Sequence, residues 1–374
     1  MASNYLEVKT HTWARDSHGL FDYDAPQKIK EVHKIFESGS LLRKGNEIIF
    51  NSEVSSPLSG LLLKIFDSVD HFLVCPVKQE QAGLIIKKLK PQNRHGLKLN
   101  QGDIIKIGRV KLKVKEINIG GHEPMNGDEY EGSVNCDSTC RICFRTHTNA
   151  IDPLVPVCKC SGSMELVHLL CLRRYMLSKS IKKNFSNCIS YLWKSLQCDV
   201  CKENLPLAIK YNDQVYDTIV IGTENSNFLT LEDNRKHKYK YILHLITPND
   251  APFLIGRATD TDLKIGDISV SRSHLTIELF KNDFYIKDNG SKFGTLVIQK
   301  KPILVSKFFS PSLQIGRTIL KFSYKTSIKP LNCLTFCCRK SGKVDNFPKS
   351  RTEIVWEEES FRSSEQYDGG DEGR

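Results

Sequence analysis

The 374-residue sequence predicts an α+β protein of several domains, in which a small cysteine-rich finger precedes an all-β sandwich. Three observations carry this prediction. Seven Cys and one His lie in four close pairs between residues 140 and 201. Short runs of alternating apolar and polar residues, separated by turn residues, extend from residue 241 to 325. A run before the finger, residues 103–115, repeats the end of that region, residues 313–322, and indicates a further β domain at the N-terminus.

The four pairs have the spacing of zinc ligands. A single C-x-x-C occurs by chance or in redox sites, whereas four pairs in register are typical of two zinc ions. On a helix, the spacing of His168 and Cys171 puts the imidazole and the thiolate on one face. Cys136 is an alternative first ligand, although its gap to Cys140 fits a zinc knuckle less well. The predicted ligands of the two Zn²⁺ ions are Cys140, Cys143, Cys158, Cys160, His168, Cys171, Cys198 and Cys201.

Other features of the sequence indicate a reducing compartment, in which the cysteines stay thiolate ligands and do not form disulfides. We therefore expect a cytoplasmic or nuclear protein. Residues 1–17 mix charged and polar residues without a signal peptide, and no apolar run is long enough for a membrane span. The net charge of +11 is mild and spread along the chain; anionic peptide partners explain its sign as well as nucleic acid does, and no nucleic acid is expected. Cys333, Cys337 and Cys338 beside Arg339 allow lipidation, but unmodified thiols are the ordinary interpretation.

The finger resembles a known family. The segments Cys140-Arg141-Ile142-Cys143, Cys158-Lys159-Cys160-Ser161-Gly162-Ser163 and Val167-His168 through Cys171-Leu172-Arg173-Arg174 are similar to the RING-CH, or RING-variant, zinc finger. This resemblance implies a cross-brace, in which the first and third pairs share one ion and the second and fourth pairs the other. The alternative with the same ligand order is the PHD finger, which has two residues where only Lys159 stands here and lacks the long helix after the sixth ligand.

The resemblance also implies a function. RING-type domains have no catalytic residue of their own; they position a ubiquitin-conjugating enzyme and its bound ubiquitin. The implied docking residues are Ile142, Pro206 and Tyr175, which stands where the family usually has Trp. The alternative for Ile142 and Tyr175 is packing within the finger.

The sandwich resembles the forkhead-associated (FHA) domain, which binds phosphothreonine. The resemblance rests on Ile255-Gly256-Arg257, Ser271-Arg272-Ser273-His274 and Asp288-Asn289-Gly290-Ser291-Lys292-Phe293-Gly294-Thr295. It implies that Arg257 and Ser271 contact the phosphate, that Arg272 adds positive charge, and that His274, Gly256 and Gly294 are architectural. Phe293 replaces the usual Asn that grips the peptide main chain, so Asn289 or Lys292 is expected to compensate. The alternative is an FHA scaffold that has lost phosphopeptide binding.

The predicted organisation is a degenerate FHA-like β domain at 1–119, a linker at 120–135, the finger at 136–206, a connecting segment at 207–237, the FHA domain at 238–328 and a disordered tail at 329–374. The N-terminal region lacks the phosphate-binding motifs, and a plain strand-rich domain is the alternative there. The finger followed by the FHA domain resembles multi-domain proteins of a protist type.

Together these features predict a RING-CH ubiquitin ligase whose FHA domain recruits phosphothreonine-containing partners. The alternative is a non-enzymatic, zinc-binding phosphopeptide adaptor.

Overall fold

Strands dominate the structure, a computed structural model that describes residues 3–15, 19–52, 60–68, 70–77, 82–86, 96–120, 134–135, 138–222, 227–233, 240–249, 251–299 and 301–327. Among these residues, α1 (Leu169–Ser178) is the one α-helix, and η2 (Gly162–Met164) is a short 3₁₀ turn before it. The predicted α+β class, the β sandwich and the N-terminal β domain are confirmed. Cys136 and the predicted tail, with Cys333, Cys337 and Cys338, lie outside the described residues.

The N-terminal sandwich packs two groups of strands around one core. One is a five-stranded sheet in the order β26-β6-β5-β3-β4, and the other is the segment β7-β27-β28-β1-β2 of a larger sheet. Buried residues from both groups, including Leu6, Leu63 and Phe322, form its core. The strands are β1 (Ser3–Trp13), β2 (Lys28–Ile35), β3 (Gly39–Lys44), β4 (Glu47–Asn51), β5 (Leu61–Asp67), β6 (Phe72–Pro76), β7 (Ala82–Ile85), β26 (Ile303–Val305), β27 (Ser312–Ile315) and β28 (Thr318–Ser327).

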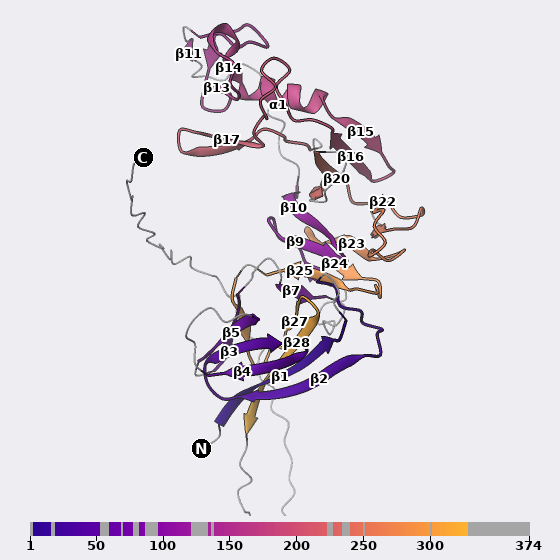
Figure 1. Ribbon diagram of the computed structural model, residues 1–374. Coiled ribbons are helices and arrows are strands. Elements are labelled where there is room, and N and C mark those ends of the chain that lie inside the picture. The colour runs from indigo at the N-terminus through magenta and orange to yellow at the C-terminus, as the bar shows by residue number, and fades with distance from the viewer. Residues whose placement is uncertain are drawn as a thin grey trace, which may run out of the picture. The chain divides into compact units, whose positions relative to one another are not determined.

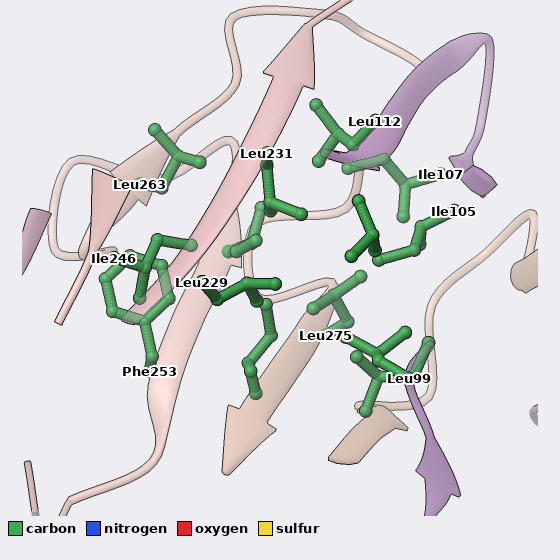
Figure 2. Close-up of a cluster of buried hydrophobic side chains, with 14 of the residues drawn as sticks. Leu99, Ile105, Ile107, Leu112, Leu229, Leu231, Ile246, Phe253, Leu263 and Leu275 are labelled. Atoms are coloured by element: carbon green, nitrogen blue, oxygen red, sulfur yellow. The ribbon is translucent and has the colours of Figure 1, made fainter. Parts of the chain in front are cut away.

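The C-terminal sandwich has the same plan. A five-stranded sheet, β22-β21-β23-β24-β8, faces the segment β20-β19-β10-β9-β25 of the larger sheet. Figure 2 shows their shared core, in which Leu99, Ile105 and Leu112 meet Leu229 and Leu275. The strands are β8 (Leu97–Lys98), β9 (Ile104–Ile107), β10 (Val110–Asn118), β19 (Phe228–Asp233), β20 (Tyr241–Ile246), β21 (Phe253–Gly256), β22 (Leu263–Lys264), β23 (Leu275–Phe280), β24 (Asp283–Asp288) and β25 (Thr295–Ile298).

The two sandwiches exchange their last strands. Strands β8 to β10 lie in the first third of the chain, yet they complete the C-terminal sandwich. Strands β26 to β28 are the last strands of the described chain, yet they complete the N-terminal sandwich. The exchange joins one sheet of each sandwich into a larger sheet of twelve strands, in which β10, β9, β25, β7, β27 and β28 follow one another (Figure 1). The repeat seen in the sequence falls on these strands: residues 103–115 cover β9 and most of β10, and residues 313–322 cover β27 and half of β28. The predicted domain ranges stay a prediction. They divide the chain into consecutive segments, whereas each sandwich here contains strands from both ends of the region.

Alternating burial explains how the hairpin β9–β10 fits its place. In β10, Val110, Leu112 and Val114 are buried, and the Lys residues between them are partly exposed. This period of two puts one apolar face toward a core and one polar face toward solvent. Either sandwich needs such a face to close its core.

The finger is an insertion between two neighbouring strands. β10 ends at Asn118, which pairs with Phe228 at the start of β19, and residues 138–222 lie between them in the chain. Strand β16 of the insertion pairs with β20, so the sandwich sheet continues through β16 and β15. The strands of the insertion, β15 and β16 included, are β11 (Val134–Asn135), β12 (His147–Thr148), β13 (Leu154–Pro156), β14 (Leu166–His168), β15 (Ile181–Asn184), β16 (Cys188–Trp193), β17 (Ala208–Tyr211) and β18 (Gln214–Asp217).

Helix α1 is held by one buried stripe and by Trp193. Leu169, Leu172 and Met176 recur at helical spacing and are buried. The fully buried Trp193 donates from Nε1 to the carbonyl oxygen of Met176 at 2.7 Å. Since Trp193 ends β16, this bond fixes the helix to the extended sheet.

Candidate functional site

The structure brings the eight Cys and His residues together in two groups of four. Cys140, Cys143, His168 and Cys171 form the first cluster, and Cys158, Cys160, Cys198 and Cys201 form the second. Within each cluster, all ligand atoms lie within 4.8 Å of one another. This is the interleaved grouping that the resemblance to the RING-CH finger implies. The sequence order of the pairs therefore becomes a cross-brace in space.

In the first cluster, His168 has a defined orientation. Its Nδ1 lies 3.2 Å from Cys143 Sγ and 4.0 Å from Cys171 Sγ. Its Nε2 lies 2.5 Å from the carbonyl oxygen of His147, an acceptor, so Nε2 carries the proton. Nδ1 is the nitrogen that faces the thiols and could bind a metal, and the carbonyl is the outer partner that metal-binding histidines usually have. The His147 ring also stacks on His168, with centroids 4.6 Å apart.

Hydrogen bonds from backbone N–H groups stabilise the thiolate form of Cys140. The N–H groups of Ile142 and His168 each point at Cys140 Sγ, at 3.4 Å. Burial raises the pKa of Cys140, but hydrogen bonds from the N–H groups of Cys143, His168 and Ile142 outweigh it and lower the pKa to about 7. Burial and the neighbouring Cys140 raise the pKa of Cys171. The cluster thus stabilises a first negative charge, and a divalent cation would stabilise the others.

In the second cluster, too, one thiol has a lowered pKa and another has a raised pKa. Burial raises the pKa of Cys198, but the N–H groups of Cys201 and Val200 outweigh it and lower the pKa to about 6. Burial and the surrounding thiols raise the pKa of Cys160 to about 12. Cys160 Sγ and Cys198 Sγ lie 3.9 Å apart. A tetrahedral site with Zn–S bonds of about 2.3 Å has a sulfur separation of about 3.8 Å, so this spacing fits zinc.

Arg141 links the two clusters. It stands between the first two ligands in the chain, yet its Nη1 lies 3.3 Å from Cys158 Sγ of the second cluster and 2.8 Å from the carbonyl oxygen of Met164. Four thiolates around Zn²⁺ leave a net charge of about −2, and a guanidinium would offset one of these charges. Neither this contact nor that of His147 was expected from the sequence, because both depend on the fold.

The donor sets fit zinc. Three thiols with one imidazole, and four thiols, are the combinations found in closed structural zinc sites. Soft sulfur donors in a tetrahedral arrangement disfavour Ca²⁺ and Mg²⁺, which prefer oxygen.

The predicted docking residues lie in different settings. Ile142 is 39% exposed, and Pro206 is half-buried. The Tyr175 hydroxyl donates to Asp199 Oδ2 at 2.5 Å and accepts from Lys179 Nζ at 2.8 Å, so its polar end is already engaged. Val200 was missed, although it occupies the same place between Cys198 and Cys201 that Ile142 has between its own ligand pair; it is 60% exposed.

In the C-terminal sandwich, the predicted phosphate-binding loops are tied together by hydrogen bonds. The Arg257 N–H donates to the carbonyl oxygen of Ser271 at 3.0 Å, and the Lys292 N–H donates to Ser271 Oγ at 3.0 Å. Arg257, Arg272 and Lys292 are exposed. Three exposed cationic residues therefore lie on the loops that meet at Ser271, and positive charges of this kind favour a phosphate dianion.

Buried contacts hold these loops in position. His274 is fully buried; its Nδ1 accepts from the Ser271 N–H at 3.0 Å, and its Nε2 lies 3.3 Å from the carbonyl oxygen of Gly294. A Cβ on Gly256 would lie 1.9 Å from the carbonyl oxygen of Arg272, so no larger residue fits there. Asp288, which sequence reasoning did not single out, accepts from Ser291 Oγ and Thr295 Oγ1 and shapes the loop that carries Lys292. The Asp-Asn-Gly turn signal was visible in the sequence.

The residues expected to compensate for Phe293 differ. Asn289 Nδ2 donates to Ser273 Oγ at 3.0 Å, so this amide braces a loop. Lys292 Nζ lies 5.8 Å from the centroid of the half-buried Phe293 ring and remains 57% exposed at its side chain. Lys292 is therefore the better placed of the two to meet a ligand.

Comparison with known proteins identifies two domain families in this chain. Residues 140–201 match the RING-variant domain, and residues 253–308 match the FHA domain. The chain thus combines a RING-variant zinc finger with an FHA domain.

The finger region is similar to E3 ubiquitin-protein ligase MARCHF7. The mouse protein (Mus musculus) is 32% identical over 83 residues, which is 22% of this chain. The rat protein (Rattus norvegicus) is 31% identical over 83 residues, and the orangutan protein (Pongo abelii) 31% over 85 residues. In each case the match spans 10% of the relative's length. No solved structure matches the chain. Within the part of the chain that the structure describes, helical segments fall short of the length and apolarity that crossing a bilayer requires.

Proposed function

We propose that this protein is a RING-CH ubiquitin ligase that holds two zinc ions and recruits phosphothreonine-containing partners through its FHA domain. The observation that carries the proposal is the pair of interleaved clusters, together with the exposed Arg257 and Lys292 beside Ser271. Similarity to MARCHF7 over the finger supports the ligase activity. The free thiols and the zinc sites favour a reducing location, cytoplasmic or nuclear.

In this proposal the finger acts by positioning. Zinc, when bound, holds the loops of the two clusters in fixed geometry and takes no part in group transfer. Ile142 and Val200, exposed between their ligand pairs, offer an apolar contact to a ubiquitin-conjugating enzyme. The enzyme's own thioester chemistry is then accelerated because the bound ubiquitin is restrained.

The ligase proposal is tested with purified full-length protein, ubiquitin and a panel of conjugating enzymes. We expect ubiquitin chains, and a loss of about tenfold or more in rate for Ile142→Ala, which leaves all eight ligands in place. Val215→Ala is the matched control, because Val215 is 71% exposed on β18, outside both clusters. If no enzyme of the panel yields chains, the ligase proposal is refuted and the adaptor function replaces it. The observation that favours an adaptor is that the Tyr175 hydroxyl is already hydrogen-bonded to Asp199 and Lys179.

The recruitment proposal is tested with a phosphothreonine peptide library. Arg257→Ala removes a charge-assisted contact with the phosphate, and we expect affinity to fall about 10- to 100-fold. Lys281→Gln is the control, because Lys281 lies in the turn between β23 and β24, at the opposite end of these strands from the binding loops. Equal binding by Arg257→Ala and the unaltered protein would refute recruitment through this site.

A further inference from the structure

A segment of the N-terminal sandwich is built into the wall of the predicted phosphopeptide site. The Tyr23 N–H donates to the carbonyl oxygen of Lys292 at 3.3 Å. The Tyr23 ring occupies the space beside Gly294, where an added Cβ would lie 2.7 Å from it. Phe21 stacks edge-on against Tyr23 and is anchored in a buried cluster that includes Leu296 of β25. The connection between β1 and β2 therefore supports the loop that carries Lys292.

Asp22 in this segment fixes the Lys292 side chain. Lys292 Nζ lies 3.4 Å from Asp22 Oδ2, and Asp22 Oδ1 accepts from the Asp24 N–H at 2.9 Å. The Asp22 side chain is only 13% exposed, whereas that of Lys292 is 57% exposed. The ammonium group is thus the more exposed member of the pair.

A cavity opens beside this ion pair. Its volume is about 320 Å³, at the lower end of the range of ligand sites. Trp13, Ala25 and Pro26 provide apolar wall, Arg15 and Lys292 provide positive charge, and Asp22 and Asp24 provide negative charge. The cavity adjoins the predicted phosphate site, because Lys292 lines the cavity with its side chain and binds Ser271 Oγ with its backbone N–H.

The charges decide what this cavity accepts. Two cations, Arg15 and Lys292, and two carboxylates, Asp22 and Asp24, line the cavity, so the charges of the lining alone cancel. Asp22 is paired with Lys292, which leaves Arg15 and Asp24 as the exposed charges without that pairing. Arg257 and Arg272 add further positive charge on the neighbouring loops. The surroundings of the cavity are therefore positive because of Arg257 and Arg272, and they favour a side chain with an apolar stem and an anionic end.

We propose that the cavity is a second peptide subsite, which selects an acidic residue, above all Glu, near the phosphothreonine of the partner. The methylenes of the Glu lie along Trp13 and Pro26, and its carboxylate faces Arg15 and Lys292. The inference rests on the proposed recruitment function of the same site. Through it, the N-terminal sandwich, which has no phosphate motif of its own, sets the specificity of the C-terminal one.

The test uses the full-length protein and phosphothreonine peptides that carry one Glu, moved stepwise through the flanking positions of an Ala background. Matching peptides carry Gln at the same position, so that only charge differs. We expect one position at which Glu binds about two- to fivefold tighter than Gln, the size of a partly exposed charge contact. Added salt reduces this ratio.

Arg15→Gln assigns the preference to the cavity. Because the Arg15 side chain is exposed, we expect this variant to fold, to bind the Gln peptide as the unaltered protein does and to lose the preference for Glu. Lys281→Gln removes the same charge at the far end of the sandwich and keeps the preference. Phosphate-dependent binding without a preference for Glu, or a preference that survives Arg15→Gln, overturns the subsite.

Two further outcomes are informative. A preference for Lys or Arg that Asp24→Asn abolishes would overturn the assigned charge of the ligand. Failure of every phosphopeptide to bind, with Arg257→Ala no different from the unaltered protein, would instead refute the recruitment function itself. The two failures are therefore distinguishable.

Discussion

The exchange of strands predicts that the FHA region does not fold on its own. A fragment of residues 238–328, the range that sequence alone assigns to the domain, lacks β8, β9, β10 and β19. From residues 97–118 it loses six buried aliphatic side chains of the C-terminal core, namely Leu99, Ile105, Ile107, Val110, Leu112 and Val114. Each contributes about 1.5–3 kcal/mol, so the loss is about 9–18 kcal/mol. That is comparable with the whole stability of a typical domain, about 5–15 kcal/mol.

The same reasoning predicts a fragment that folds. Asn118 pairs with Phe228 across β10 and β19, so an Asn-Gly turn can replace everything between them and join residues 96–118 to residues 228–299. We expect this chain to unfold cooperatively on heating, whereas fragment 238–328 shows no cooperative transition and no dispersed amide spectrum. A cooperatively folded 238–328 that binds phosphopeptide would refute the exchange, because β27 and β28 would then close their own sandwich.

Three further predictions concern the zinc sites and the loops. Arg141→Ala is expected to weaken zinc binding at the second cluster by about 10- to 100-fold, measured by competition with a chelator, while Arg145→Ala leaves it unchanged. Zinc affinity is expected to fall as pH falls from 8 to 6, because zinc must displace protons from thiols such as Cys160, whose pKa is raised to about 12. Calorimetry in buffers of different ionisation enthalpy measures the protons released. A zinc affinity that does not depend on pH would contradict this prediction. Gly256→Ala is expected to lower the free energy of unfolding by about 1–3 kcal/mol, because its Cβ would collide with a carbonyl oxygen 1.9 Å away, while Gly266→Ala, with nothing within 4 Å, is neutral by thermal denaturation.

The parts of the structure foreseen from the sequence are those that local chemistry fixes. Zinc ligands need set spacings, so the two groups of four could be proposed from the order of Cys and His alone. The motif around Ser271 and His274 was equally visible, since one turn brings the His274 ring to the backbone of Ser271. These features involve few residues and short separations in the chain.

Features that depend on distant pairing were not foreseen. The hairpins β9–β10 and β27–β28 carry the same alternation of apolar and polar residues, so either could close either sandwich. The two hairpins of the repeat are similar in sequence, so the sequence does not indicate which hairpin belongs to which sandwich. The contacts of Arg141 with the second cluster, and of Tyr23 with Lys292, arise only once these strands are placed.

The closing strands of the first sandwich are also the last part of the described chain to leave the ribosome. Strands β1 to β7 emerge early, but their core is incomplete until residues 303–327 have been synthesised. At translation speeds of about 5–20 residues per second, the nascent apolar faces wait for tens of seconds, a period in which chaperones matter. A stop codon anywhere before β26 would therefore leave the N-terminal sandwich open as well, and the loss would not be confined to the truncated end.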